Sequence, residues 1–105
     1  QLEKYKGLRN VQHLRGNLQL NLLALFLERQ VYVEGLEVAD QFILEFKRKK
    51  LFMHLAIAYA RKGILLNRLA MPGEQECYDT CFTILSFVDY QQLEEEIRKE
   101  IKEYT

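Results

Sequence analysis

The stretch LAIAYARKGILLNRLAMPGEQECYDTCFTIL, residues Leu55–Leu85, decides the fold class of this 105-residue chain. Its first half repeats apolar residues at steps of three and four, which is the period of one helix face. The segment MPG at residues 71–73 then ends the helix, because proline lacks the amide hydrogen that a helix interior needs and glycine tolerates the following turn. Helical spacing resumes from Cys77 onward. The stretch therefore predicts a helical hairpin.

The same spacing extends in both directions along the chain. The expected stripes on either side of Gly35 are Leu18, Leu22, Leu25 and Phe26 in a helix running to about Tyr32, then Leu36, Ala39, Phe42, Ile43 and Phe46. The segment from Leu51 to Leu69 is expected to form the longest helix. A last helix is predicted to open at Asp89 with a capping box to Gln92, and its stripe is Leu93, Ile97, Ile101 and Tyr104. The first 16 residues are less periodic and are compatible with one more helix around residues 2–14.

A short pattern repeats along the chain. Gly35, Ala39 and Ile43 recur 38 residues later as Gly73, Cys77 and Cys81. This period is close to the ~34 residues of a tetratricopeptide-like hairpin. We therefore predict a single all-α domain over residues 1–105, with antiparallel tetratricopeptide-like hairpins stacked in a short right-handed superhelix and closed by a C-terminal capping helix. The first helix of each hairpin is expected to line a concave side.

Composition limits the classes of function. The 15 basic and 15 acidic side chains cancel, whereas a DNA-binding face normally carries a basic excess. A run of ~18 uncharged apolar residues is absent, so the sequence predicts no membrane span. Two cysteines are too few for a disulfide scaffold and favour a reducing cytoplasm. The chain begins at Gln1, directly in a helical pattern, and we expect it to be part of a longer protein.

The two cysteines are the most obvious candidates for chemistry. Cys77 and Cys81 share one helix face, which leaves open a metal site, a redox pair or simple packing. A zinc site needs four ligands, and the two histidines, His13 and His54, lie far away in sequence. Cys77 also takes the place of Ala39 in the repeat, so we predict that both cysteines pack between helices. No catalytic motif is present, and we expect no enzyme activity, metal or cofactor.

Polar residues near the helix ends suggest a binding groove. Asn67 and Arg68 lie near the end of the long helix, and Arg61 lies two turns earlier. At the 38-residue offset Asn67 falls on Arg29, so stacked hairpins would project both into one groove. Amide and guanidinium groups suit the backbone and carboxylate of an extended peptide. We predict peptide contacts at Arg29, Arg61, Asn67 and Arg68, with an ordinary polar helix end as the alternative.

These features resemble a known family. The helix LAIAYARKG with Lys62-Gly63, the helix PGEQECYDTCFTILSF and the closing helix VDYQQLEEEIRKEIKEYT are similar to the C-terminal part of Rgg/MutR-type regulators of Gram-positive bacteria. The segment LERQVYVEGLEVADQFILEF resembles the preceding repeat. The likeness covers roughly residues 18–105 and consists of diffuse repeat patterns. One departure is Val88-Asp89-Tyr90, where the family more usually has a leucine-glycine turn.

The resemblance implies a function as well as a fold. In that family, helical repeats dimerise and bind a short signalling peptide on their concave face, and a separate N-terminal helix-turn-helix domain contacts DNA. We therefore expect this chain to be the cytoplasmic, peptide-sensing and dimerisation domain of a bacterial transcriptional regulator, touching DNA only through a domain absent here. The alternative is a generic tetratricopeptide-like scaffold for a protein partner. A small metal or redox protein using Cys77 and Cys81 is the third reading.

Overall fold

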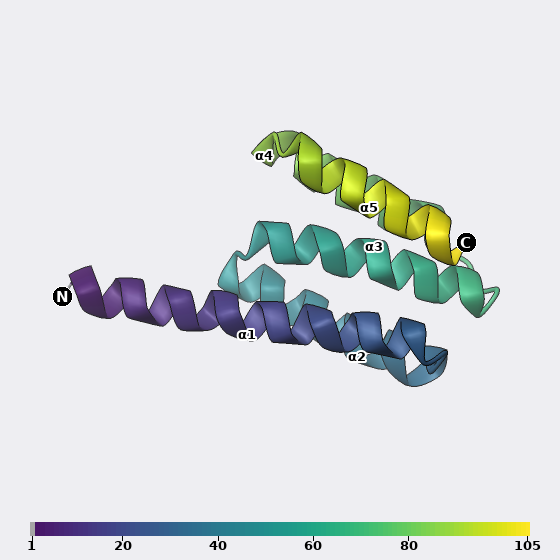
Figure 1. Ribbon diagram of the computed structural model, residues 1–105, viewed down its shortest axis with the longest axis horizontal. Helices are drawn as coiled ribbons and strands as arrows, with labels where there is room; N and C mark the ends of the chain where they lie inside the picture. The colour runs from purple at the N-terminus through teal and green to yellow at the C-terminus, as the bar shows by residue number, and fades with distance from the viewer. Residues whose placement is uncertain (1) are drawn as a thin grey trace.

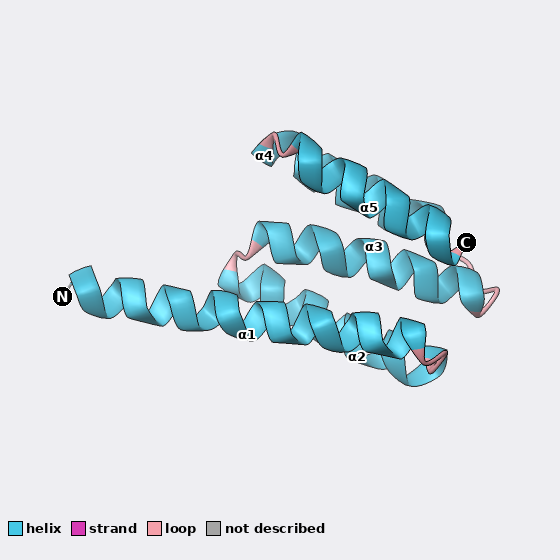
Figure 2. Cartoon of the chain, viewed as in Figure 1, coloured by secondary structure: helices cyan, strands magenta, loops and turns pink. Residues whose placement is uncertain are grey.

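Five α-helices joined by short turns build the protein (Figures 1 and 2). The computed structural model describes residues 2–105, with side chains from residue 7 onward. The helices are α1 (Leu2–Glu28), α2 (Tyr32–Lys49), α3 (Phe52–Arg68), α4 (Glu74–Val88) and α5 (Gln91–Tyr104). Residues 2–105 contain no strand. The all-α prediction is therefore confirmed over that range.

Helix α3 is the centre of the molecule and contacts each of the four other helices. In Figure 1 it lies between the α1–α2 pair and the α4–α5 pair. Small residues make this position possible, because Ala56, Ala58, Ala60 and Gly63 are all buried and allow neighbouring backbones to approach. One side of α3 packs with α1 and α2, and the other packs with α4 and α5.

Helix α1 differs from its prediction in length and in orientation. It is one continuous 27-residue helix and is longer than α3, so the region around residue 16 does not separate two helices. The residues of α1 that enter the core are Leu20, Leu23 and Leu27. Three residues of the predicted stripe, Leu18, Leu22 and Leu25, are exposed, so most of that stripe was wrong. Its fourth residue, Phe26, packs against the core as expected.

The physical reason for this orientation lies at Gly16. A Cβ built on Gly16 would lie 2.6 Å from Cδ2 of the His54 ring, which is too close for any larger side chain. Helix α3 therefore approaches α1 along the face that contains Gly16 and Leu20. On that face His54 Nε2 hydrogen-bonds Asn17 Oδ1 at 2.8 Å. Periodicity alone could not choose between two apolar faces of the same helix.

The two repeat glycines have different roles. Gly73 lies in the turn before α4 at φ 105°, a backbone conformation that glycine adopts at little cost. Gly35 lies inside α2 and is buried, and a Cβ there would lie 3.1 Å from Leu65 Cδ2 and from Phe26 Cβ. The first hairpin turns earlier, at residues 29–31, where Gln30 has φ 60°. The prediction that Gly35 interrupts the helix was wrong, because this glycine serves close packing.

The ends of α2 and α4 are defined by local residues, and the end of α4 corrects one prediction. The basic run after Phe46 occupies the last turn of α2, where cations interact favourably with the helix dipole. Asp89 does not open α5. It ends α4 at φ 48°, with its amide bonded to Leu85 O, and the residue before α5 is Tyr90, which makes no side-chain capping bond. The predicted capping box was therefore wrong, although Leu93 and Ile97 are buried as expected.

Candidate functional site

A groove of about 860 Å³ lies between α4 and α5. Helix α5 packs on α3 as well as on α4, and the two last helices separate enough to leave this space between them. Ligand-binding pockets commonly measure ~300–1,000 Å³, so the space suits several residues of a peptide. The lining residues are Gln75, Tyr78, Asp79, Phe82, Thr83 and Ser86 from α4, and Arg98, Ile101, Lys102 and Thr105 from α5 and its end. We call this hollow the α4–α5 groove.

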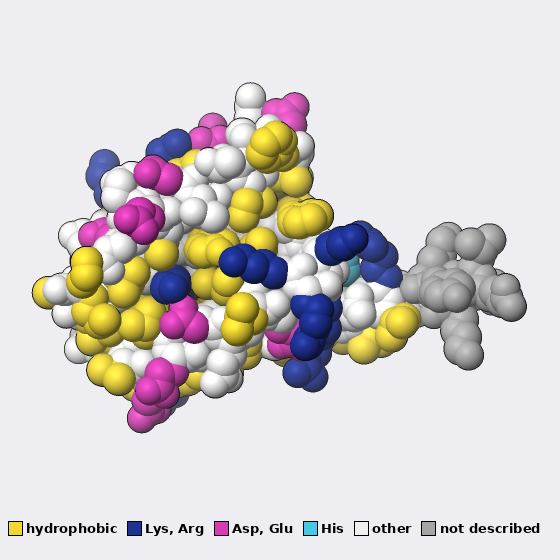
Figure 3. Space-filling view, turned by 180° about the vertical axis from the view of Figure 1, so that it is seen from behind, with side chains coloured by type: hydrophobic (Ala, Val, Ile, Leu, Met, Phe, Trp, Pro, Cys, Tyr) yellow, Lys and Arg dark blue, Asp and Glu magenta, His cyan; other side chains and the backbone are white. Residues whose placement is uncertain are grey.

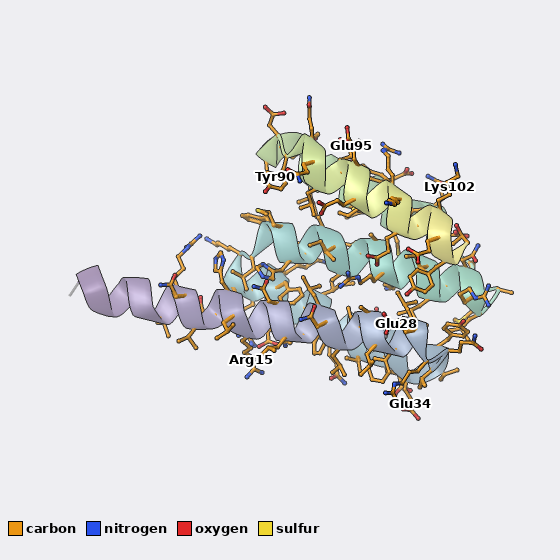
Figure 4. All side chains as sticks on the ribbon, in the orientation of Figure 1. Arg15, Glu28, Glu34, Tyr90, Glu95 and Lys102 are labelled. Carbon is orange, nitrogen blue, oxygen red and sulfur yellow. The ribbon has the colours of Figure 1, made fainter. Side chains whose placement is uncertain are left out.

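The floor of the α4–α5 groove is apolar and its α5 rim is basic. Phe82 and Ile101 pack against the core from this side. The guanidinium of Arg98 lies 4.0 Å from the centre of the Phe82 ring and donates to Glu94 Oε1 at 2.8 Å. Lys102 follows Arg98 by one helical turn and projects from α5 near the C-terminus (Figure 4). An anionic or carbonyl-rich segment could therefore lie along this rim.

The α4 rim offers mainly oxygen acceptors. Gln75 Nε2 donates to Asp79 Oδ1 at 2.9 Å, and Ser86 Oγ donates to the carbonyl of Thr83 at 2.6 Å. Tyr78 is tied to the same helix, because its hydroxyl donates to Glu74 Oε2 at 2.8 Å. Burial and the Glu74 carboxylate raise the pKa of Tyr78 well above its usual range. Acceptors on one rim and cations on the other give the groove a defined polarity.

Arg61, predicted as a peptide contact, bridges three helices. Its Nε donates to Glu100 Oε1 at 2.8 Å and its Nη2 to Glu100 Oε2 at 3.1 Å. Its Nη1 donates to the carbonyl of Leu20 at 2.7 Å. The hydrogen bonds of this guanidinium therefore connect α3 to both α5 and α1. The cleft beside Arg61 measures about 140 Å³, which leaves room for only a few atoms.

The other three predicted residues lie at one end of the molecule. Asn67 Nδ2 donates to Glu74 Oε1 at 3.2 Å, and Arg68 Nε donates to the Tyr32 hydroxyl at 3.1 Å. Arg29 directly follows α1 and is exposed. Helices α1, α3 and α5 all end on this side in Figure 1, where the groove residue Thr105 also lies. Asn67 and Arg68 thus bond to different helices, and neither forms a hydrogen bond with Arg29 among the described residues.

A smaller cavity of about 380 Å³ opens between α2, α3 and α4. Figure 3 shows the face of the molecule on which α2 and α4 lie, with apolar side chains gathered on it. Lys62 lines this cavity and pairs with Asp40 Oδ1 at 2.7 Å, and this hydrogen bond raises the pKa of Lys62. Next to it, Gly63 lies directly against the ring of Tyr78. The Lys62-Gly63 pair is therefore explained by an ion pair to α2 and by close packing with α4.

The cysteines are packed as predicted. Both thiols are free and buried, and Cys81 is fully enclosed. Burial raises the pKa of Cys77 and raises that of Cys81 to about 12. A protonated, enclosed thiol is a poor nucleophile and a poor metal ligand. Across the described residues, no group of three or more His, Cys, Asp and Glu side chains is placed to hold a metal ion.

Sequence reasoning missed the α4–α5 groove. Arg98 was not among the predicted peptide contacts, and in the structure it pairs with Glu94 on the same helix. Phe82 was not predicted as a contact either. One sequence signal was available: Phe82 lies between the polar residues Asp79 and Ser86, at one-turn spacing on α4. Such an aromatic on a mixed helix face is typical of an interaction surface.

Comparisons with protein-family models, with curated proteins and with solved structures find no match to this chain. None of the described helices is both long enough and apolar enough to cross a membrane.

Proposed function

We propose that this domain recognises a short peptide or protein segment in the α4–α5 groove. The observation that carries the proposal is the combination of an apolar floor, a cationic rim and a volume of about 860 Å³. Peptide-binding grooves between helices typically bury apolar anchors of the ligand and use a few polar groups to fix its direction. Phe82 would contact apolar side chains of the peptide. Arg98 and Lys102 would pair with its carboxylates or carbonyls.

The groove is preferred over the cleft beside Arg61 because of size and exposure. Both Arg61 and Arg98 are paired with a carboxylate, but the side chain of Arg61 is only 15% exposed and that of Arg98 is 59% exposed. A ligand at Arg61 would have to break the less exposed pair with Glu100 and replace both of its hydrogen bonds. Arg29, Asn67 and Arg68 remain candidate contacts for a peptide that extends beyond the end of the groove, since they lie on the side of the molecule where Thr105 ends the chain.

We further propose that the domain is the regulatory part of a bacterial transcriptional regulator, acting in the cytoplasm as a homodimer. This step rests on the resemblance to Rgg/MutR-type regulators and on the 38-residue repeat. In this reading α1–α2 and α3–α4 are tetratricopeptide-like hairpins in a right-handed superhelix and α5 is the capping helix. DNA would be contacted only by a separate N-terminal domain. Recognition is non-covalent and requires no cofactor.

The same groove suits the alternative, a general scaffold for a protein partner. The coding sequence upstream of residue 1 distinguishes the two, because a helix-turn-helix pattern there favours the regulator. An upstream region with further helical repeats and no helix-turn-helix favours the scaffold.

A displayed library of random short peptides tests the binding proposal. The library is selected against the immobilised chain, and affinities of the selected peptides are measured by fluorescence anisotropy. Phe82→Ala or Arg98→Ala should weaken binding by about tenfold or more, as truncation of a central contact usually does. The matched controls are Phe87→Ala and Arg48→Ala, because Phe87 is an exposed phenylalanine outside the groove and Arg48 an exposed arginine on α2. No enrichment, or equal losses in variants and controls, would contradict the proposal.

A further inference from the structure

Helix α1 carries two apolar faces on opposite sides. The inner face holds Leu20, Leu23 and Leu27, which are buried against the other helices. The outer face holds six large apolar residues that are 40–63% exposed: Leu8, Val11, Leu14, Leu18, Leu22 and Leu25. Each residue of a helix advances by about 100°, so these six fall within about one third of the circumference, opposite the inner face. A helix that is apolar on both sides is normally buried on both sides.

We propose that the outer face of α1 binds the same face of a second copy of this chain, with the two helices antiparallel. The spacing of the six residues is compatible with this arrangement. Leu8 and Leu25 are equally far from the midpoint between residues 16 and 17, and so are Val11 and Leu22. Leu14 and Leu18 are centred on residue 16, so their distances from the same midpoint differ by one residue. Two antiparallel copies would therefore place apolar residues opposite apolar residues along the whole face.

Such a palindromic face is what a two-fold interface requires. In a symmetric dimer the same patch must be complementary to itself, with each residue meeting its counterpart across the axis. The outer face meets this requirement, because a stripe at three- and four-residue steps reads nearly the same in both directions. The inference rests on the homodimer proposed above and assigns its surface, whereas it does not depend on peptide binding in the α4–α5 groove, because its evidence lies entirely in α1.

The helix dipoles favour the antiparallel direction, because antiparallel packing opposes the dipoles of the two copies. Arg15 lies beside the outer face and is paired with Glu45 of α2 at 3.2 Å. It therefore brings no uncompensated charge to the interface.

The available area approaches that of a standard-size interface. The six residues offer roughly 600 Å² per copy, compared with the ~800 Å² that each partner contributes to a standard-size interface. The face is also accessible, because the N-terminal part of α1 extends beyond the other helices (Figure 1). Side chains that flank the outer face would have to contribute the remaining buried area to reach the standard size.

Size-exclusion chromatography with light scattering over a wide concentration range tests the interface. The unaltered chain should have twice its 12.5 kDa mass. Leu18→Lys at the centre of the face should weaken self-association by about a hundredfold or more, since a buried unpaired charge is costly. The matched control Leu44→Lys should remain a dimer, because Leu44 is 68% exposed on α2, away from the face. Far-UV circular dichroism should show equal helix content in the unaltered chain and in both variants.

Disulfide trapping tests whether the two α1 helices of the dimer run antiparallel. Both native cysteines are buried, so Leu8→Cys and Leu25→Cys introduce the accessible thiols. A mixture of the two variants should form mainly the mixed disulfide under mild oxidation. A monomer at every concentration, dimerisation that survives Leu18→Lys, or trapping mainly of Leu8→Cys with itself would overturn the proposal.

Discussion

Arg61 and Glu100 form a two-bonded ion pair that joins the central helix to the last helix, at 2.8 Å and 3.1 Å. The same guanidinium also donates to the carbonyl of Leu20 in α1. One side chain thus fixes three parallel helices relative to one another. We infer that its main role is structural.

Arg61→Ala should therefore lower the free energy of unfolding by about 2–3 kcal/mol, because Glu100 and the Leu20 carbonyl both lose a partly buried partner. A double-mutant cycle with Glu100→Ala, measured by urea denaturation, gives the coupling free energy between Arg61 and Glu100. The exposed pair Arg98–Glu94 is the matched control and should show coupling of about 0.5 kcal/mol or less. Equal coupling in the two pairs would contradict the structural role.

Gly63→Ala should destabilise the protein by about 1–3 kcal/mol, because the added methyl group would overlap the ring of Tyr78 between α3 and α4. Gly7→Ala is the control, since no described atom lies within 4 Å of a Cβ built there. Alanine has the higher helix propensity, so Gly7→Ala should raise stability by up to ~1 kcal/mol. Thermal unfolding should shift in opposite directions for the two variants, and a shift in the same direction would argue against close α3–α4 packing.

His54 should make the folded state sensitive to mild acid. Burial lowers the pKa of His54, and the nearby ring of His13, 5.4 Å away between centroids, adds to this effect. The unfolded chain therefore takes up the proton first, so stability should fall as the pH drops below about 6.5. His54→Gln should flatten the dependence between pH 7 and pH 5, measured by urea denaturation. An unchanged slope in that variant would show that another group is responsible.

Glu45 should determine part of the stability at lower pH. Hydrogen bonds from Lys49 and Gln19 hold the pKa of Glu45 at about 2, well below its usual value. A lowered carboxyl pKa stabilises the folded state above the unfolded value of 4.5, and that contribution is lost as the pH falls from there towards 2.

Glu45→Gln should thus cost about 1 kcal/mol at neutral pH and less at pH 3, because Glu45 is only partly buried. Glu95→Gln is the control, since Glu95 projects into solvent from α5 (Figure 4). A loss for Glu45→Gln that is equal at both pH values would rule out the titration of Glu45 as its cause.

Much of the architecture could be predicted from the sequence because it depends on local signals. The Pro72-Gly73 turn, the basic end of α2 and the stripe of α5 each follow from residues within one or two helical turns. The orientation of α1 could not be predicted, because it carries apolar residues on two faces. The choice between them depends on Gly16 and His54, which are far apart in sequence and meet only in the fold.

The candidate site was harder to predict for a related reason. A groove between two helices depends on how far they separate, and that distance is set by the packing of α5 on α3 and by the Arg61–Glu100 pair. Arg61 was identified as important from its position, but the ion pair with a residue 39 positions later is not visible in the spacing. The buried cysteines were predicted correctly, because their repeat position is a packing position.

The central claim is that α4 and α5 form the peptide-binding groove, and amide chemical-shift mapping tests it most directly. A library-selected peptide is titrated into ¹⁵N-labelled chain while ¹H–¹⁵N correlation spectra are recorded. We predict that the largest shifts fall on residues 75–86 of α4 and 98–105 of α5, and that the Phe82→Ala variant loses them. Shifts concentrated on α1 or around Arg61, with residues 75–86 unchanged, would contradict the account.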